Sequence, residues 1–126
     1  MEPEDHKYNI ITTCSDLDIE TVVHDWWEGV DMTDKTVHAD GLPGKFHGRY
    51  TAKDLDGSPA AVHVILSIDR KDAESVLRVT VQLNTYTRDY HGMLEDVVCS
   101  LVRLLKEKDP GVRTKKGYLL QRKIEC

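Results

Sequence analysis

The sequence predicts an α+β fold: a single-layer antiparallel sheet, in the order β-α-β-β-β-β-α-β, with two amphipathic helices packed on one face. Three observations lead to this fold. Apolar residues occupy every second position in three consecutive segments between Lys45 and Leu83, as in strands with one solvated face. Residues 15–30 and 90–109 instead place apolar residues at helical spacing. Glycine, proline and aspartate separate these segments and mark turns.

Length and composition indicate one globular, soluble domain. The chain has 126 residues, of which 31% are charged and 40% hydrophobic, within the range of folded proteins. We expect a single domain over 1–126, with a core at 8–109 and a basic C-terminal tail at 110–126. No apolar run is long enough to span a membrane, and the acidic start is unlike a signal peptide. A cytoplasmic location, or alternatively a nuclear one, is expected.

The N-terminal third is expected to form a strand followed by a helix. Residues Tyr8 to Cys14 are rich in the β-branched and aromatic types that favour strands. Ser15 is a candidate helix N-cap, and acids in the next turns suit the helix dipole. Gly29 is the expected stop, and Trp27 lies at the stripe edge, either covering the core rim or exposed. The helical apolar stripe comprises Ile19, Val22, Val23, Trp26 and Val30.

Hairpins are expected in the middle of the chain, after a short strand at 36–40. In the first hairpin the apolar residues of both strands have even numbers. These residues share one face of the sheet only if each even-numbered residue pairs with another even-numbered residue. A three-residue loop at 55–57, with Gly57 in a left-handed bulge position, meets this condition. It pairs Tyr50 with Val62 and, further along, Phe46 with Leu66.

The second hairpin follows from the same alternation. A four-residue loop at 71–74 brings Ile68 opposite Leu77 and continues the apolar face. In this combined register His47 and His63 both point to the outer face of the sheet, about one diagonal apart.

A second helix and a candidate edge strand complete the predicted fold. Thr87 or Asp89 can cap the helix, and Pro110 with Gly111 ends it. The tail at 118–124 is a candidate edge strand, preceded by a basic connector at 113–117. The apolar stripe of the helix comprises Tyr90, Leu94, Val97, Val98, Leu101, Leu104 and Leu105.

The cysteines and the charges carry two further expectations. Cys14, Cys99 and Cys126 are few and widely spaced, so we expect free thiols, with Cys126 at a mobile chain end. Residues 1–40 hold eleven acids against two bases, whereas 103–126 hold three acids against eight bases. If the chain ends lie apart, the molecule has an acidic side and a smaller basic side, which favours charged partners.

An enzyme is the first alternative function. His47 and His63 on the sheet, or Cys14 at a helix start with His91 nearby, are the groups that such an enzyme would use. The sequence contains no compact zinc signature, no G-x-S-x-G and no phosphate-binding G-K-[ST]. We therefore assign no catalytic or metal-binding residue and no cofactor.

A nucleic-acid-binding module that uses the basic C-terminal region, 103–123, is the second alternative. The predicted outer face offers bases but no aromatic pair on which nucleic-acid bases would stack. The sequence pI of about 5.6 also argues against this class.

The sequence favours a non-enzymatic protein–protein interaction module: an adaptor, an assembly subunit or a small inhibitor. Exposed aromatic residues and unpaired edge strands are common features of such surfaces. The expected partner is another protein, or a second copy joined through an edge strand as a homodimer. Residues proposed for the interaction surface are Trp27, His47, Arg49, His63, Lys115, Lys116, Tyr118, Leu120 and Arg122.

Overall fold

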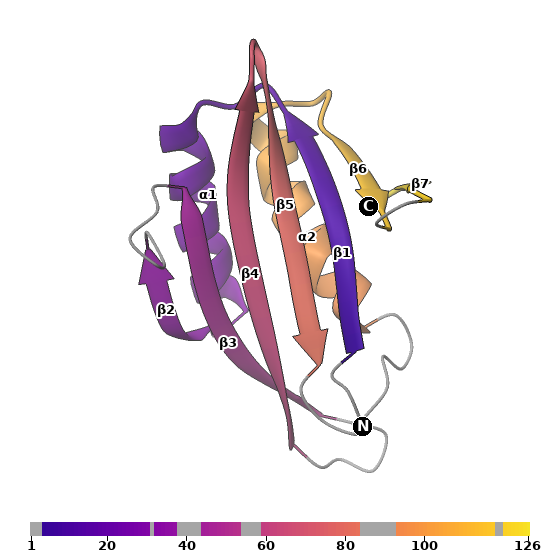
Figure 1. Ribbon diagram of the computed structural model, residues 1–126. Coiled ribbons are helices and arrows are strands. Elements are labelled where there is room, and N and C mark those ends of the chain that lie inside the picture. Colours follow the sequence, from indigo (N-terminus) through magenta and orange to yellow (C-terminus); the bar gives the residue numbers. More distant parts are fainter. Residues whose placement is uncertain (1–3, 31, 38–43, 54–58, 84–92, 118–119) are drawn as a thin grey trace.

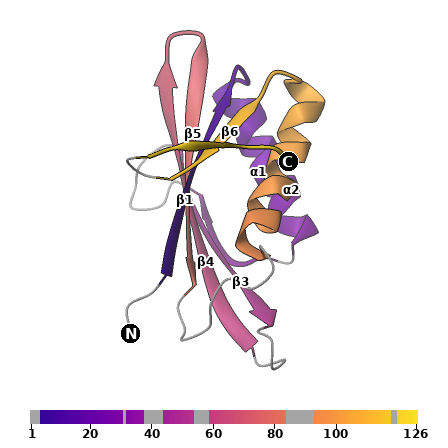
Figure 2. The ribbon, with the colours of Figure 1, turned by 90° about the vertical axis from the view of Figure 1, so that its right-hand side faces the viewer.

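The computed structural model describes residues 4–30, 32–37, 44–53, 59–83, 93–117 and 120–126. These residues form one open antiparallel sheet of seven strands in the order β2-β3-β4-β5-β1-β6-β7, with both helices on one face (Figures 1 and 2). The predicted α+β architecture is thereby confirmed. In chain order the elements are β1 (Glu4–Thr12), α1 (Asp16–Gly29), β2 (Thr33–Val37), β3 (Lys45–Lys53), β4 (Pro59–Lys71), β5 (Glu74–Leu83), α2 (Met93–Lys108), β6 (Arg113–Lys116) and β7 (Arg122–Ile124).

Helix α1 begins and ends where the sequence predicts. Ser15 is extended, and its Oγ accepts a hydrogen bond from the backbone N–H of Asp18 at 3.2 Å. This cap satisfies one of the backbone donors that a helix leaves unpaired at its start. The helix ends at Gly29, and Val30 follows as its C-cap. Its buried face comprises Ile19, Val22, Val23, Trp26 and Trp27.

Both hairpins have the predicted register. Tyr50 pairs with Val62, and in the next hairpin Ile68 pairs with Leu77. The second turn is tighter than the predicted four-residue loop, because pairing continues to Lys71 opposite Glu74. Asp72 in this turn takes a positive φ of 54°, a conformation that aspartate tolerates better than most residues. The expected bulge at Gly57 lies outside the described residues.

Two element boundaries differ from the prediction. β1 runs over Glu4–Thr12 instead of Tyr8 to Cys14, because it pairs with β5 along its whole length. β2 runs over Thr33–Val37 instead of 36–40, and residues 38–40 lie outside the described part. The caps proposed for the second helix lie outside it too, and α2 is described from Met93 to Lys108.

The tail folds differently from the single edge strand predicted at 118–124. The connector forms β6, which pairs with β1, and residues Arg122–Ile124 return as β7 on its far side. Gly117 permits this reversal: its φ is 120°, and a Cβ there would collide with the carbonyl oxygen of Leu120. Its N–H donates to the Lys7 carbonyl at 2.9 Å, which fixes the end of β6 on β1.

The hydrophobic core lies between the sheet and the helices, with the opposite sheet face uncovered by either helix (Figure 2). No described helix is long and apolar enough to cross a membrane. The largest fully buried side chains include Trp26, Trp27, Tyr8 and Phe46. At about 25 cal/mol per Å² of buried apolar surface, such residues provide much of the drive to fold.

The core packs closely around the backbone at Gly48. A Cβ at this position would lie 2.6 Å from Met32 Cγ and 3.2 Å from Trp27 Nε1. We expect Gly48→Ala to lower the free energy of unfolding by about 1–3 kcal/mol through overpacking. Gly29→Ala is the matched control, because nothing lies within 4 Å of that Cβ position and alanine favours helix. Urea unfolding of both variants tests this; equal stability of the two would contradict the tight packing.

Candidate interaction surface: the outer face of the sheet

The sheet face opposite the helices, called the outer face here, is rich in basic side chains. Alternation along the paired strands places them there, because residues that face each other across a ladder share one side. At those outward positions of β1 and β3–β7 whose side chains the structure describes, the acids are Asp69 and Glu74. The bases on the same positions are Lys7, Lys45, Arg49, Lys71, Arg78, Arg113, Lys115 and Lys123.

The placement of β1 brings together bases that are distant in the sequence. β1 lies between β5 and β6, and Asn9 pairs with Arg78 on one side and with Lys115 on the other. The N-terminal Lys7 is two residues away on the same side of β1. Three separate parts of the chain therefore contribute positive charge to one continuous surface.

In the helix layer, α1 is acidic, whereas α2 carries three acids and three bases. Helix α1 contains Asp16, Asp18, Glu20, Asp25 and Glu28 but no lysine or arginine. The acids of α1 therefore lie on one side of the sheet and the bases of the outer face on the other. The condition for the expected polarity, that the chain ends lie apart, is not met, because β1 pairs with β6 and Lys7 and Lys115 share the outer face.

A hollow of about 220 Å³ lies in this basic surface. The turn after β6 forms one wall with Gly117 and Gln121, while the sheet forms the floor. The Arg78 guanidinium donates to Asp69 at 3.1 Å, an exposed ion pair that a competing carboxylate can exchange with at small cost. The sheet side chains that line the hollow and can bind an anionic or polar group are Lys7, Asn9, Ser67, Arg78 and Thr80.

His47 and His63 lie together on the outer face, as the register predicts. Their ring centroids are 5.7 Å apart and their planes differ by 9°, a stacked arrangement. Arg49 is exposed and pairs with His63 across β3 and β4. No group of three possible metal-ligating side chains occurs within the described part of the chain. The two rings therefore offer hydrogen-bonding groups on a basic surface.

Trp27 is not at the surface, which corrects its proposed place among the interaction residues. Its side chain is 1% exposed, and its ring packs edge-to-face on Phe46 at 5.9 Å and on His24 at 5.3 Å. The glycine at position 48 leaves room for the indole beside Met32. Trp27 therefore belongs to the core.

The remaining predicted residues, all from the tail, divide between different environments. Lys115 is on the outer face, whereas Lys116 lies over the Tyr8 ring at 5.5 Å. Arg122 forms an ion pair at 3.8 Å with Glu95 of α2. Leu120 is 93% exposed. Tyr118 lies outside the described residues.

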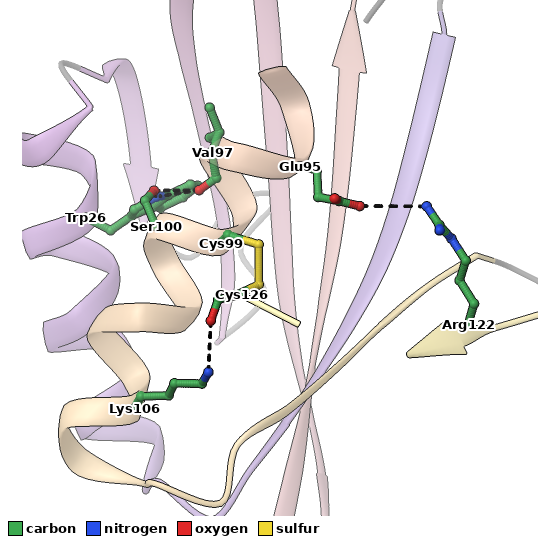
Figure 3. The surroundings of a disulfide bond; sticks show 8 residues. All are labelled: Trp26, Glu95, Val97, Cys99, Ser100, Lys106, Arg122 and Cys126. Atoms are coloured by element: carbon green, nitrogen blue, oxygen red, sulfur yellow. Dashed lines mark hydrogen bonds and ion pairs between the residues drawn. A yellow bond between two sulfur atoms is a disulfide. The ribbon is translucent and has the colours of Figure 1, made fainter. Parts of the chain in front are cut away.

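The cysteines differ from the expected three free thiols. Cys99 in α2 and the terminal Cys126 form a disulfide, with Cα atoms 5.0 Å apart (Figure 3). The pairing arises because the chain returns along β6 as β7 and brings Cys126 beside Cys99 of α2, which residue spacing in the sequence does not reveal. Cys14 is free but buried. Its proposed partner, His91, lies outside the described residues, so no nucleophile–base pair is described there.

No model of a known protein family matches this chain, and no curated protein sequence matches it either. The candidate surface consequently depends on geometry alone. Sequence reasoning missed Lys7, Lys71, Arg113 and Lys123 as parts of it. The alternation of β1 would have placed Lys7 outward, but the neighbours of β1 could not be inferred from a local pattern.

Proposed function

We propose that this protein is a non-enzymatic interaction module that binds an acidic surface of another protein through its outer face. The supporting observation is the separation of charge across the sheet: bases gather on the uncovered sheet face while α1 carries acids. Complementary charge steers partners and disfavours wrong orientations. The hollow beside Lys7 and Arg78 is suited to receive a carboxylate side chain of that partner.

A protein partner fits this face better than a nucleic acid does. The described outward positions include no phenylalanine, tyrosine or tryptophan on which bases would stack. They do include half-buried aliphatic side chains among the bases, which a protein interface would cover. These aliphatic residues are Ile11, Ile65 and Val76.

Charge reversal in the hollow tests the proposal. We expect Lys7→Glu combined with Arg78→Glu to abolish co-purification of the partner, measured by quantitative mass spectrometry from cell extract. Lys108→Glu is the matched control, because this exposed lysine ends α2, which packs on the sheet face opposite the outer face. Each charge reversal opposite a carboxylate of the partner should weaken binding by roughly 1 kcal/mol or more. Repulsion adds to the loss of an exposed ion pair.

The same experiment separates the alternatives. Proteins retained by wild type and Lys108→Glu, but lost from the double variant, support the proposal. If nuclease treatment removes the captured material, the partner is a nucleic acid and the proposal fails. Light scattering of the purified protein tests for a homodimer. A dimer that persists in the double variant would mean that self-association does not use the outer face. Identical protein sets for all variants would contradict a role for the outer face.

A further inference from the structure

The last strand, β7, is held against β6 by an unfavourable set of side-chain pairs. Lys115 pairs with Lys123, and Lys116 pairs with Arg122. Like charges directly opposite each other destabilise an antiparallel pair. The third pair, Thr114 with Ile124, is the one that packs toward the core. The segment 120–126, called the strap here, therefore matches β6 poorly in charge.

Few noncovalent contacts compensate for this mismatch. Arg122 reaches Glu95 at 3.8 Å through a side chain that is 72% exposed, and exposed ion pairs contribute little. The Lys106 ammonium donates to the Cys126 carbonyl at 3.1 Å (Figure 3). Within the described residues, β7 pairs with β6 and with no other strand. The disulfide to Cys99 is thus the strongest link between the strap and the rest of the molecule.

We propose that β6 is a redox-gated docking edge for an extended acidic segment of a partner protein. While Cys99 and Cys126 are joined, the strap occupies the edge. After reduction, the segment displaces the strap and adds to the sheet as an antiparallel strand. This inference rests on the proposed function, since its occupant is an acidic protein, but it concerns the β6 edge instead of the outer face.

The gating step is a thiol–disulfide exchange with a cellular thiol reductant. A thiolate of the reductant attacks the sulfur of Cys126, which is more exposed than Cys99, and the Cys99 sulfur leaves and takes up a proton. A second reductant thiol then releases Cys126. Overall, two reductant thiols become one disulfide while the protein disulfide becomes two thiols.

The edge left by the strap would select its occupant by charge and by one apolar side chain. β6 would present its backbone donors and acceptors with Lys115 and Lys116 beside them. A hollow of about 270 Å³ lies beside the strap, and its walls include Val102, Val112 and Ile124 together with charged residues of α2, β6 and the strap. A segment with two acids followed by isoleucine or valine places carboxylates opposite both lysines and its apolar residue in the position of Ile124.

Two synthetic peptides test this selection. The acidic peptide has the sequence of residues 120–126 with Arg122→Glu, Lys123→Glu and Cys126→Ser, and the control peptide carries Cys126→Ser alone. We expect fluorescence anisotropy to detect neither peptide on the oxidised protein. After dithiothreitol treatment, the acidic peptide should bind at least about tenfold more tightly than the control. The reason is that its two glutamates face Lys115 and Lys116, where the control peptide places two bases.

Hydrogen exchange provides an independent measurement on the full chain. Reduction, or Cys126→Ser, should raise the exchange rate of the β6 amides while far-UV circular dichroism stays nearly unchanged. Lys123→Glu should restore protection in the reduced protein, because it faces Lys115, and Lys123→Gln should restore it less. Unchanged β6 protection after reduction would overturn the gate, and equal affinity for both peptides would overturn the charge selection. A strand-swapped dimer after reduction, detected by light scattering, would also overturn the proposal of a partner segment at the β6 edge.

Experiments can contradict the outer-face proposal and the docking-edge proposal independently of each other. Lys45→Glu with Arg49→Glu should leave redox-dependent binding of the acidic peptide within about twofold, because β4, β5 and β1 separate β3 from β6 and neither residue lines the hollow beside the strap. Loss of peptide binding in this folded variant would contradict the separate docking edge. Loss of redox dependence with retained partner capture would contradict the gate and leave the outer-face proposal intact.

Discussion

Trp26→Ala is expected to lower the free energy of unfolding by about 3–5 kcal/mol, a large fraction of the roughly 5–15 kcal/mol that stabilises a typical domain. Trp26 is 1% exposed, and its indole joins the two helices. The Nε1–H donates to the Val97 carbonyl at 3.1 Å and to Ser100 Oγ at 2.8 Å, both in α2 (Figure 3). Alanine removes this packing, these hydrogen bonds and most of the side-chain volume.

Urea denaturation followed by circular dichroism measures the loss of stability. Trp26→Phe keeps an aromatic ring but removes the donor, so it should cost roughly 1–3 kcal/mol through the loss of two part-buried hydrogen bonds. Leu17→Ala on the same helix is the control, because Leu17 is 72% exposed. A Trp26→Ala variant within about 1 kcal/mol of wild type would refute the view that this residue fixes α2 on α1.

The parts of the fold set by nearby residues were predicted from sequence. Ser15 and Gly29 delimit α1 because capping and termination act within one or two turns. The register that pairs Tyr50 with Val62 follows from alternation, since a one-residue shift would reverse the faces of a strand. These signals need no knowledge of the remaining fold.

Features produced by distant segments were not predictable in the same way. β6 pairs with β1 across about a hundred residues of sequence, and its charged side chains carry no apolar alternation. The Cys99–Cys126 disulfide depends on that pairing, because β7 is built on β6. Trp27 is adjacent to Trp26 on a helix, so spacing alone could not show that α1 buries both. The basic outer face likewise required the sheet order, which brings Arg78 and Lys115 to either side of Asn9.

A buried carboxylate fixes the start of β6 and so links stability to the proposed docking edge. Asp109 follows α2 and is 9% exposed. Its Oδ2 accepts from Thr12 Oγ1 at 2.8 Å and from the Thr13 N–H at 2.9 Å, and its Oδ1 accepts from the Gly111 N–H at 3.0 Å. These contacts join the end of β1 to the turn between α2 and β6.

Asp109→Ala is expected to lower the free energy of unfolding by about 2–4 kcal/mol, because hydrogen bonds to a charged group are lost and buried donors remain without a partner. Asp109→Asn, a matched variant of the same size, should cost less, since its amide oxygen can still accept from Thr12 or Thr13. Urea unfolding at pH 7 measures both. Equal and small losses in the two variants would contradict a carboxylate clamp at this turn.

The clamp also predicts the direction of acid sensitivity. The Thr13 backbone hydrogen bond, with those of Thr12 and Gly111, lowers the pKa of Asp109 in the folded protein, although burial acts in the opposite direction. A carboxyl with a lowered folded pKa stabilises the protein fully above its unfolded-state pKa of about 3.9 and loses this contribution as pH falls through the folded value. Wild type should therefore lose more unfolding free energy between pH 7 and pH 3 than Asp109→Asn does. Parallel losses would mean that the acid dependence arises from other carboxylates and that the Thr12 and Thr13 contacts contribute little to keeping Asp109 ionised.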